Sequence, residues 1–499
     1  MGEITHVIEK FKKYLGNISA YQEALMLIHW DMRTKIPQKG VEQRSEVAGL
    51  LGEKIHKLET SDEMKYYIDA VKESSTDPLL LKIAEVCEEN YERNRKIPTE
   101  EYRLFIMAQT KSEAVWQEAR EKADFRLFQP DLEKLMDFNR KFATYWGYED
   151  NIYDALLHNF EPGVTTKMLD EVFPRLRKSL LNLLTKITNS SNQPNPALLQ
   201  NHFPKKDQET FTKKILEQMG YDFQAGRLDE TIHPFAIALN KNDVRITTRY
   251  DEQDFRMAVF GTIHEGGHGL YEQNIDDRLM RTPLATGTSM GIHESQSLFW
   301  ENFIARSQSF WETNYDLFLQ YAPKAFQQVD RDQFYHAINE VKPSFIRIEA
   351  DELTYSLHIM IRYELEKSLI NNDIQVKDLP ALWNEKMKDY LGIVPPSDKE
   401  GVLQDIHWAG GDFGYFPSYA LGYMYAAQIY QTMNQQLDIE SIVKSADFTK
   451  IKQWLGTSIH QYGKVKNPLE IIHDVTKEPL NPDHLICYLQ EKYATIYQF

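Results

Sequence analysis

Cysteine is almost absent from this sequence of 499 residues, which contains only Cys87 and Cys487. Two thiols so far apart in the chain cannot form the disulfide framework that stabilises small secreted domains. Such scarcity is typical of proteins from reducing compartments. We therefore expect a cytoplasmic protein whose stability comes from a hydrophobic core.

Basic residues are also scarce relative to acidic ones. The chain has 57 Lys and Arg against 74 Asp and Glu, so its formal net charge at pH 7 is −17. Proteins that bind DNA or RNA neutralise phosphates with a basic surface, and no basic stripe stands out in this sequence. The charge balance excludes nucleic acid as an expected partner.

Apolar segments that could enter a membrane are missing as well. The first residues alternate charged and apolar side chains at helical spacing, unlike the apolar core of a signal peptide. One uncharged run, residues 413–437, contains Pro417, four Gln and one Asn, which make it too polar for a membrane span. With 42% hydrophobic and 26% charged residues, we expect a soluble globular protein that does not bind membranes.

Apolar residues spaced three and four apart dominate the chain, which predicts helices. Two such stripes are formed by Val47, Leu50, Leu51, Ile55 and Leu58 and by Met168, Val172, Leu176, Leu180 and Leu184. Segments rich in Pro, Ser, Asn and Gly separate the helices, but none is long enough for an interdomain linker. We predict a mainly α-helical fold in which residues 1–499 form a single domain, although length alone would suggest roughly three.

One region departs from the helical pattern. Residues 233–239 and 244–250 are rich in β-branched and aromatic side chains and flank the turn-forming segment 240–243, which predicts a β-hairpin. The hairpin is either a solvent-facing element or a wall of an active site, since the motif described next follows it directly.

Residues 264–268 have the sequence HEGGH, a pattern typical of a zinc site on a helix. His264 and His268 are four residues apart, so both imidazoles lie on one helical face and can bind one Zn²⁺. Glu265 then lies beside the metal, where its carboxylate can take a proton from an attacking water. The glycines weaken a helix by about 1 kcal/mol each, which suggests that another backbone or a substrate approaches closely.

A catalytic zinc site needs a third protein ligand and an open position. The segment around residues 289–306 predicts a second helix, which carries His293 and Glu294. A loop after His268 would let this helix return antiparallel to the first. We favour Glu294, although the residues alone leave both candidates open.

Five motifs in this order resemble those of the carboxypeptidase Taq family of zinc-dependent metallocarboxypeptidases. They are DVRIT at 243–247, HEGGH at 264–268, HESQ at 293–296, IRIEAD at 346–351 and GVLQDIHW at 401–408. The resemblance implies a mostly helical homodimer with a long central groove, which releases single amino acids from peptide C-termini. The helices within about residues 1–110 are then expected to form a lid over this groove.

The resemblance also implies roles for individual residues. His264, His268 and Glu294 would be the zinc ligands, and Glu265 the general base. His407 of the GVLQDIHW motif would donate a hydrogen bond to the scissile carbonyl.

The arrangement is also similar to the helical zinc peptidases related to angiotensin-converting enzyme, where a His and a Tyr stabilise the oxyanion. Pro417 favours a helix start, which places Tyr419 and Tyr423 on one helical face. We favour Tyr419 as the oxyanion donor and expect Tyr423 to contact substrate.

A carboxypeptidase must recognise a free carboxylate, for which the planar fork of Arg is suited. Arg245 of DVRIT and Arg347 of IRIEAD are the candidates, and the alternative for each is a structural ion pair. One departure concerns the partner that orients a ligand histidine. In several other zinc peptidases an Asp lies four residues after the Glu ligand, where this chain has Leu298. The remaining options are Gln296, Glu301, Asp351 and Asp405.

The sequence thus predicts a zinc metallocarboxypeptidase of broad specificity that acts on peptides, with Co²⁺ or Mn²⁺ able to replace Zn²⁺. An oligopeptidase or dipeptidase of the same zinc class is the enzymatic alternative. A non-catalytic peptide-binding protein is a third hypothesis, but its signature would be a lost ligand or base, and all four residues are present.

Overall fold

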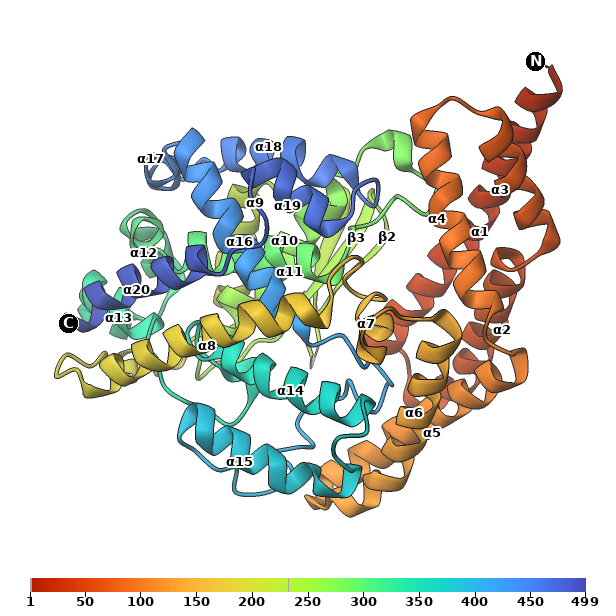
Figure 1. Cartoon of the computed structure of the whole chain (residues 1–499). Helices are drawn as coiled ribbons and strands as arrows, with labels where there is room; N and C mark the ends of the chain where they lie inside the picture. The colour runs from red at the N-terminus through yellow and green to blue at the C-terminus, as the bar shows by residue number, and fades with distance from the viewer. Residues whose placement is uncertain (1, 232) are drawn as a thin grey trace.

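The computed structural model describes residues 2–231 and 233–499, and most of them lie in helices (Figure 1). The α-helices are α1 (Gly2–Thr34), α2 (Val41–Glu59), α3 (Asp62–Ser74), α4 (Pro78–Arg95), α5 (Thr99–Lys122), α6 (Phe125–Trp146), α7 (Ile152–Leu157), α8 (Thr166–Asn189), α9 (Lys205–Met219), α10 (Phe255–Gln273), α11 (Met290–Leu298), α12 (Gln308–Tyr321), α13 (Arg331–Ile338), α14 (Tyr355–Ile370), α15 (Leu379–Leu391), α16 (Pro417–Gln436), α17 (Ile439–Lys444), α18 (Thr449–Ser458), α19 (Pro468–Thr476) and α20 (Asp483–Tyr497). Short helical turns are η1 (Gln38–Gly40), η2 (Pro196–Leu199), η3 (Asp277–Leu279), η4 (Phe299–Ala305), η5 (Lys324–Gln328), η6 (Arg347–Glu349), η7 (Val376–Asp378) and η8 (His460–Tyr462). The mainly helical fold predicted from the spacing of apolar residues is confirmed.

Many helix boundaries follow from local side-chain chemistry. The Ser61 hydroxyl accepts a hydrogen bond from an amide in the first turn of α3, and the carboxylates of Asp77 and Asp124 do the same for α4 and α6. Glycines in the left-handed conformation end α9 at Gly220 and α15 at Gly392, with φ angles of 83° and 70°.

A small sheet of three strands lies beside α10. Its order is β1 (Gly226–Glu230), β3 (Asp243–Thr248) and β2 (Ala236–Asn240), with β1 parallel and β2 antiparallel to β3. The predicted hairpin is therefore confirmed, with shorter strands. β1 was not predicted, because Gly226–Glu230 contains few residues that favour strands.

The sheet lies between two helices. On one face, Ile246 of β3 is buried and packs near Gly269 of α10. On the other face, Arg245 lies over the ring of Trp30 in α1, and the Trp30 ring also contacts Phe235. The hairpin is thus an internal wall between α10 and the N-terminal helices, instead of a solvent-facing element.

The N-terminal helices α1 to α4 have a hydrophobic core of their own. It contains Phe11, Ile68 and Ala84, all fully buried, and is completed by Ile275 and Leu284 from the segment after α10. In Figure 1 these helices stand on one side of the molecule, in red and orange. Their suggested role as a lid stays a prediction.

The uncharged run at 413–437 forms α16, a central helix of the larger core. Ala420, Leu421, Met424 and Ile429 on it are fully buried, and α16 packs against α11, α14 and α20. Within residues 2–231 and 233–499, no helix is both long enough and apolar enough to cross a membrane. The polar residues of the run distinguish this buried helix from a membrane span.

Candidate metal centre and active site

Two histidines of α10 form one side of the candidate metal centre. The helix begins after Asp254, whose carboxylate accepts a hydrogen bond from the amide of Arg256, and continues through a largely buried stretch. Because His264 and His268 are one turn apart, their rings lie on the same face with centroids 5.0 Å apart.

Glu294 of α11 faces both histidines. Its Oε2 atom lies 3.7 Å from Nε2 of His264 and 3.5 Å from Nε2 of His268. The three potential ligand atoms all lie within 4.8 Å of one another. The structure thus brings together the three residues expected as ligands, and it is Glu294, not His293, that joins the two histidines.

The ring nitrogens of both histidines fit a metal site. Nδ1 of His264 lies 2.9 Å from Oε2 of Glu301, and Nδ1 of His268 lies 2.6 Å from Nδ1 of His293. Each histidine therefore uses Nδ1 for a protein partner and directs Nε2 toward Glu294. A set of two imidazoles and one carboxylate, with oriented outer nitrogens, suits a divalent cation such as zinc.

Close helix packing makes this convergence possible. A Cβ atom built on Gly267 of α10 would lie 2.6 Å from the backbone oxygen of Gln296 in α11. A Cβ atom on Gly422 of α16 would lie 2.7 Å from Cβ of Glu294. Gly267 of the HEGGH motif therefore allows a neighbouring backbone to approach closely. The sequence had suggested that either a backbone or a substrate does so.

Glu301 supplies the orienting carboxylate that Leu298 cannot provide. It lies in η4, a π-helical turn that continues α11, and its other oxygen accepts a hydrogen bond of 3.0 Å from Arg306. Single π-helical turns are frequent at functional sites. Of the other options, Gln296 pairs with His460, Asp351 bonds to backbone amides and Thr354, and Asp405 pairs with arginines.

The charges around the two histidines are strongly coupled. Burial alone would lower the pKa of His264, but the nearby carboxylates of Glu294 and Glu301 outweigh it and raise the value to about 10. Burial would raise the pKa of Glu301, but His264 and Arg306 lower it to about 2. The cluster therefore concentrates negative charge, which a bound cation would neutralise.

Glu265 is buried beside this cluster, with 8% of its surface exposed. Burial, opposed by the charge of His264 and reinforced by that of Glu294, raises its pKa to about 7. Such a carboxyl group can both take up and release a proton near neutral pH.

His407 lies in the long segment between α15 and α16, and contacts from several elements hold this segment in place. Glu366 of α14 accepts hydrogen bonds of 2.7 Å from Nε1 of Trp408 and 3.1 Å from the amide of Gly414. Nε1 of Trp116 in α5 donates to the backbone oxygen of Leu403 at 3.1 Å. These contacts give an irregular segment a defined position.

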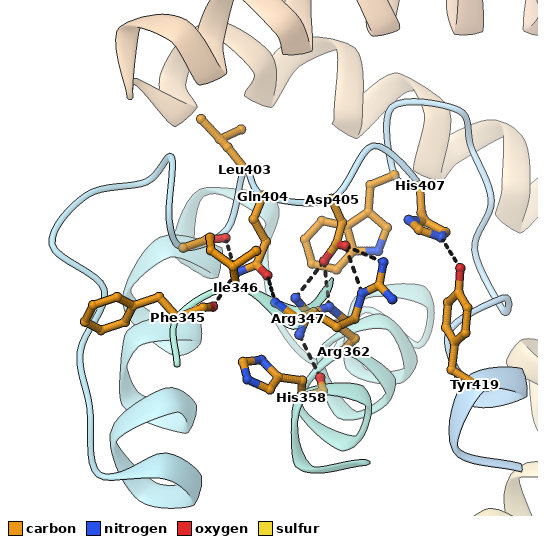
Figure 2. A network of polar contacts seen from close by, with 12 residues as sticks. Phe345, Ile346, Arg347, His358, Arg362, Leu403, Gln404, Asp405, His407 and Tyr419 are labelled. Atoms are coloured by element: carbon orange, nitrogen blue, oxygen red, sulfur yellow. Dashed lines mark hydrogen bonds and ion pairs between the residues drawn. The ribbon is translucent and has the colours of Figure 1, made fainter. Parts of the chain in front are cut away.

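His407 and Arg347 meet at Tyr419, the first-turn tyrosine of α16 (Figure 2). Nε2 of His407 lies 3.1 Å from the Tyr419 hydroxyl, and the Arg347 guanidinium lies 4.7 Å from the centre of its ring. Burial raises the pKa of Tyr419 to about 12, with Arg347 opposing the shift and the charge of Glu294 adding to it. Gly422, one turn further along α16, packs against Glu294, so the first turn of α16 lies beside the candidate metal ligands.

A buried ion-pair network surrounds Arg347, which is 6% exposed (Figure 2). Its Nη2 lies 2.9 Å from Oδ1 of Asp405, while Nη2 of the fully buried Arg362 lies 2.6 Å from Oδ2 of the same carboxylate. Arg362 also donates to the backbone oxygen of His358 at 2.7 Å. Two arginines thus share one carboxylate, which leaves local positive charge in a chain that is acidic overall.

Arg245 is not brought into this arrangement. Its Nε and Nη2 atoms donate to the two carboxylate oxygens of Asp243, each at 2.7 Å, and it lies on the face of the sheet opposite α10. The structure therefore favours the ion-pair alternative for Arg245 over carboxylate recognition.

Tyr423, which was expected to contact substrate, is likewise not brought into the site. It is fully buried, and its ring packs against Phe303 with centroids 6.0 Å apart. Burial and the negative charge of Glu352 raise its pKa. Tyr419 and Tyr423 are thus one turn apart on α16, but Tyr419 lies beside His407 whereas Tyr423 lies in the core.

Two tyrosines beside Arg347 and Tyr419 were not predicted from the sequence. Burial chiefly raises the pKa values of Tyr355 and Tyr415, and Glu294 contributes to both shifts. The Tyr355 hydroxyl accepts a hydrogen bond of 3.4 Å from Arg347, and the Tyr415 ring stands 5.2 Å from that of Tyr419. The four-residue spacing of Tyr415 and Tyr419 was a signal that could have been used.

The fold and the site together define a helical metallopeptidase. The chain belongs to the carboxypeptidase Taq (M32) metallopeptidase family, whose sequence model matches residues 10–493. The resemblance drawn from the five motifs is thus confirmed, and the chain is a metallocarboxypeptidase.

Relatives of the chain are similar over nearly their whole length. Carboxypeptidase 1 of Bacillus subtilis (strain 168) is 52% identical over 496 residues, which cover 99% of both chains. Thermostable carboxypeptidase 1 of Thermus thermophilus is 39% identical and covers 97% of this chain and 96% of its own. The crystal structure of the M32 carboxypeptidase from Deinococcus radiodurans R1 aligns with a TM-score of 0.96 at 32% identity, covering 99% of this chain and all of the other.

Proposed function

We propose that this metallocarboxypeptidase is zinc-dependent and releases single C-terminal amino acids from peptides with broad specificity. The observation that carries the proposal is the convergence of His264, His268 and Glu294, whose ligand atoms lie within 4.8 Å of one another. Three protein ligands of this kind leave a position open, which is the pattern of a catalytic zinc site. Co²⁺ and Mn²⁺ are expected to substitute for Zn²⁺.

Glu265 is proposed as the general base. A zinc ion held by the three ligands would polarise the scissile carbonyl and lower the pKa of the attacking water. Glu265 takes the proton of this water and then gives it to the leaving amino group. Its pKa of about 7, raised by burial, supports both transfers.

His407 and Tyr419 are proposed as donors to the carbonyl oxygen as negative charge develops on it. Burial and the positive charge of Arg347 lower the pKa of His407 to about 3, so the ring is neutral and carries one N–H. Tyr419, with its pKa of about 12, keeps its proton. Each group therefore carries one proton at neutral pH, and the hydrogen bond between them must break before both can donate to the substrate.

Arg347 is proposed to attract the C-terminal carboxylate of the substrate. It lies against Tyr419, and with Arg362 it contributes two positive charges against the single charge of Asp405. The excess positive charge favours a free carboxylate over an amide.

Two substrates distinguish this function from that of an oligopeptidase. We expect cleavage of a peptide with a free C-terminus, with single amino acids as the products identified by mass spectrometry. The same peptide with a C-terminal amide is expected to resist cleavage. Internal cleavage of the amidated peptide would support the oligopeptidase alternative.

The proposed base can be tested by Glu265→Gln together with metal analysis. We expect one zinc ion per chain in both proteins, with kcat lower by about 10²–10⁴-fold in the variant because general base catalysis is lost. A variant that turns over normally would overturn the mechanism.

We further propose that the enzyme is a cytoplasmic homodimer. Exposed apolar side chains on α2 and α5, among them Leu50 at 67% and Met107 at 56% exposed, support self-association. Light scattering after size exclusion should give about twice the chain mass, and a monomeric mass would refute the dimer.

A further inference from the structure

A hydrogen-bonded chain of side chains runs from His268 through His293 to Glu272. Nδ1 of His268 lies 2.6 Å from Nδ1 of His293, and Nε2 of His293 lies 2.9 Å from Oε1 of Glu272. Glu272 is 5% exposed, and the same oxygen accepts a hydrogen bond of 2.9 Å from the amide of Gly287. The sequence indicated His293 only as the alternative to Glu294 for the third ligand, and nothing in the proposed mechanism uses Glu272.

Hydrogen-bond chemistry sets the direction of this chain. A carboxylate has acceptors and no donor, so Nε2 of His293 donates to Glu272. Nδ1 of a neutral His293 then carries a lone pair, and Nδ1 of His268 must donate its proton to it. This leaves the lone pair of His268 on Nε2, the nitrogen that faces Glu294.

The reverse direction would close the metal site. If Nδ1 of His293 donated, His268 would accept at Nδ1 and carry its proton on Nε2, where a metal could not bind. The carboxylate of Glu272 opposes this state, because it fixes the proton of His293 on Nε2.

Local packing fixes the position of the His293 ring as well. A Cβ atom on Gly287 would lie 2.7 Å from Cδ2 of His293, and the Tyr271 ring stands 5.1 Å from the imidazole. The amide of Gly287 meanwhile bonds to Glu272. The same turn therefore holds both members of the chain beyond His268.

We infer that His293 and Glu272 are positioning residues that select the metal-binding tautomer of His268 and orient its ring. The inference rests on the proposed metal site, since it concerns how one of its ligands is prepared. It also explains why two neighbouring candidates for the third ligand occur in one motif. Glu294 faces the proposed metal position, and His293 bonds to Nδ1 of His268, the ring nitrogen that points away from it. His264 is served differently, because its Nδ1 contacts the carboxylate of Glu301 directly.

Two substitutions at one position separate hydrogen bonding from packing. His293→Asn retains an acceptor near the place of Nδ1, whereas His293→Leu fills similar space without one. We expect the Leu variant to bind zinc about 10–100-fold more weakly, measured by competition with a chelator, and the Asn variant to keep most of the affinity. The absorption spectrum of the Co²⁺-substituted protein should change in the Leu variant.

His460→Leu is the matched control. Like His293, His460 lies beside Tyr271; it is fully buried, and it bonds to Gln296 of α11 at 2.9 Å without contacting a ligand histidine. Its replacement should lower the melting temperature of the metal-free protein and leave zinc affinity unchanged.

The outcomes are distinct. Wild-type protein that binds no zinc would refute the proposed function itself. Wild-type protein that binds zinc, with equal affinity and an equal Co²⁺ spectrum in His293→Leu, would refute only the inference. Equal losses of affinity in the Asn, Leu and His460 variants would reduce His293 to a packing residue and also refute it.

Discussion

His407 shows how a buried environment determines the protonation state of a candidate catalytic side chain. Burial and Arg347 lower its pKa to about 3, while Asp405 opposes the shift. A histidine with such a pKa is neutral throughout the range from pH 5 to pH 8, so its proposed role is that of a hydrogen-bond donor and not of an acid.

His407→Ala is therefore expected to lower kcat/KM by about 10²–10³-fold, the effect of losing one oxyanion donor. The shape of the pH profile between pH 5 and pH 8 should stay the same, because no ionisation of His407 occurs there. Initial rates with a peptide of free C-terminus across this range test the prediction. The disappearance of one limb of the profile in the variant would show that His407 ionises and contradict it.

Asp405 supplies the negative charge that pairs with the two buried arginines, Arg347 and Arg362. Burial would raise its pKa, but the charges of Arg347 and Arg362 outweigh burial and hold it below the usual range. Because the pKa is lower in the folded protein, the stabilisation is present above the unfolded-state pKa of about 4 and is lost as the pH falls below it.

Asp405→Asn leaves two buried guanidinium groups without a counter-charge and should lower the free energy of unfolding by about 3–5 kcal/mol at pH 7. Urea unfolding at pH 7 and at acidic pH measures the effect. The difference from wild type should shrink on acidification, and a difference that grows instead would contradict the assigned ion pair. Lys122→Ala is a useful comparison, because it removes an ion pair with Glu118 whose side chains are 60% and 59% exposed, and it should change stability little.

At the scale of elements, the site depends on how closely α10, α11 and α16 approach one another. Gly267 and Gly422 lie at the contacts where an added Cβ would meet the neighbouring helix at 2.6 and 2.7 Å. Gly261 lies on the same α10 helix, but there an added Cβ would meet only Sδ of Met257, at 4.0 Å. Two glycines of one helix therefore have opposite expected responses to substitution.

Gly267→Ala should lower the free energy of unfolding by about 1–3 kcal/mol, because the contact is with backbone that cannot move aside. Zinc affinity should fall as well, since Glu294 is displaced from the two histidines. Gly261→Ala should instead stabilise the protein by about 0.5–1 kcal/mol through helix propensity. Thermal unfolding and zinc titration of both variants test the pair, and equal shifts in the two would contradict the packing argument.

At the scale of the whole molecule, two hydrophobic cores divide the chain. The smaller core holds α1 to α4, while the larger contains α16 and the helices around the candidate metal centre. The molecule is acidic overall, at −17, yet Arg347 and Arg362 keep positive charge beside the proposed site. This local charge supports the proposed attraction of a negatively charged substrate terminus, although the chain as a whole is acidic.

Ile68→Ala should loosen the smaller core selectively. Ile68 is fully buried in α3, and removing its side chain should destabilise its surroundings by about 2–5 kcal/mol. Hydrogen exchange measured by mass spectrometry should increase in α1 to α4, while zinc affinity stays at the wild-type value. Increased exchange in α10, α11 and α16 to the same extent would show that the two cores unfold as one unit.

Patterns that are local in the sequence predicted much of this protein. The spacing of apolar residues predicted the helices, and two histidines four residues apart predicted one face of a metal site, since both follow from 3.6 residues per turn. The hairpin was found from its turn and its β-branched strands, whereas β1 was missed because it pairs with a distant strand and has little local preference.

Contacts between distant segments were decided only by the tertiary structure. The residues alone could not separate Glu294 from His293, because both lie on one helix and only its packing against α10 determines which one faces the histidines. Glu301 contacts His264 because it lies in a π-helical turn, which the 3.6-residue periodicity of an α-helix does not predict. Arg245, in contrast, pairs with Asp243, which is only two residues away in the chain.

The sequence by itself thus determined that the chain is a helical protein with a zinc-type motif and, through five ordered motifs, the family to which it belongs. Only the tertiary structure decided which side chains surround that motif and what holds each ligand in place. The physical reason is that helix formation and the spacing of two ligands on one helix depend on neighbouring residues. The rest of the site depends on the approach of helices tens to hundreds of residues apart, which is set by packing at single glycines and by buried charge.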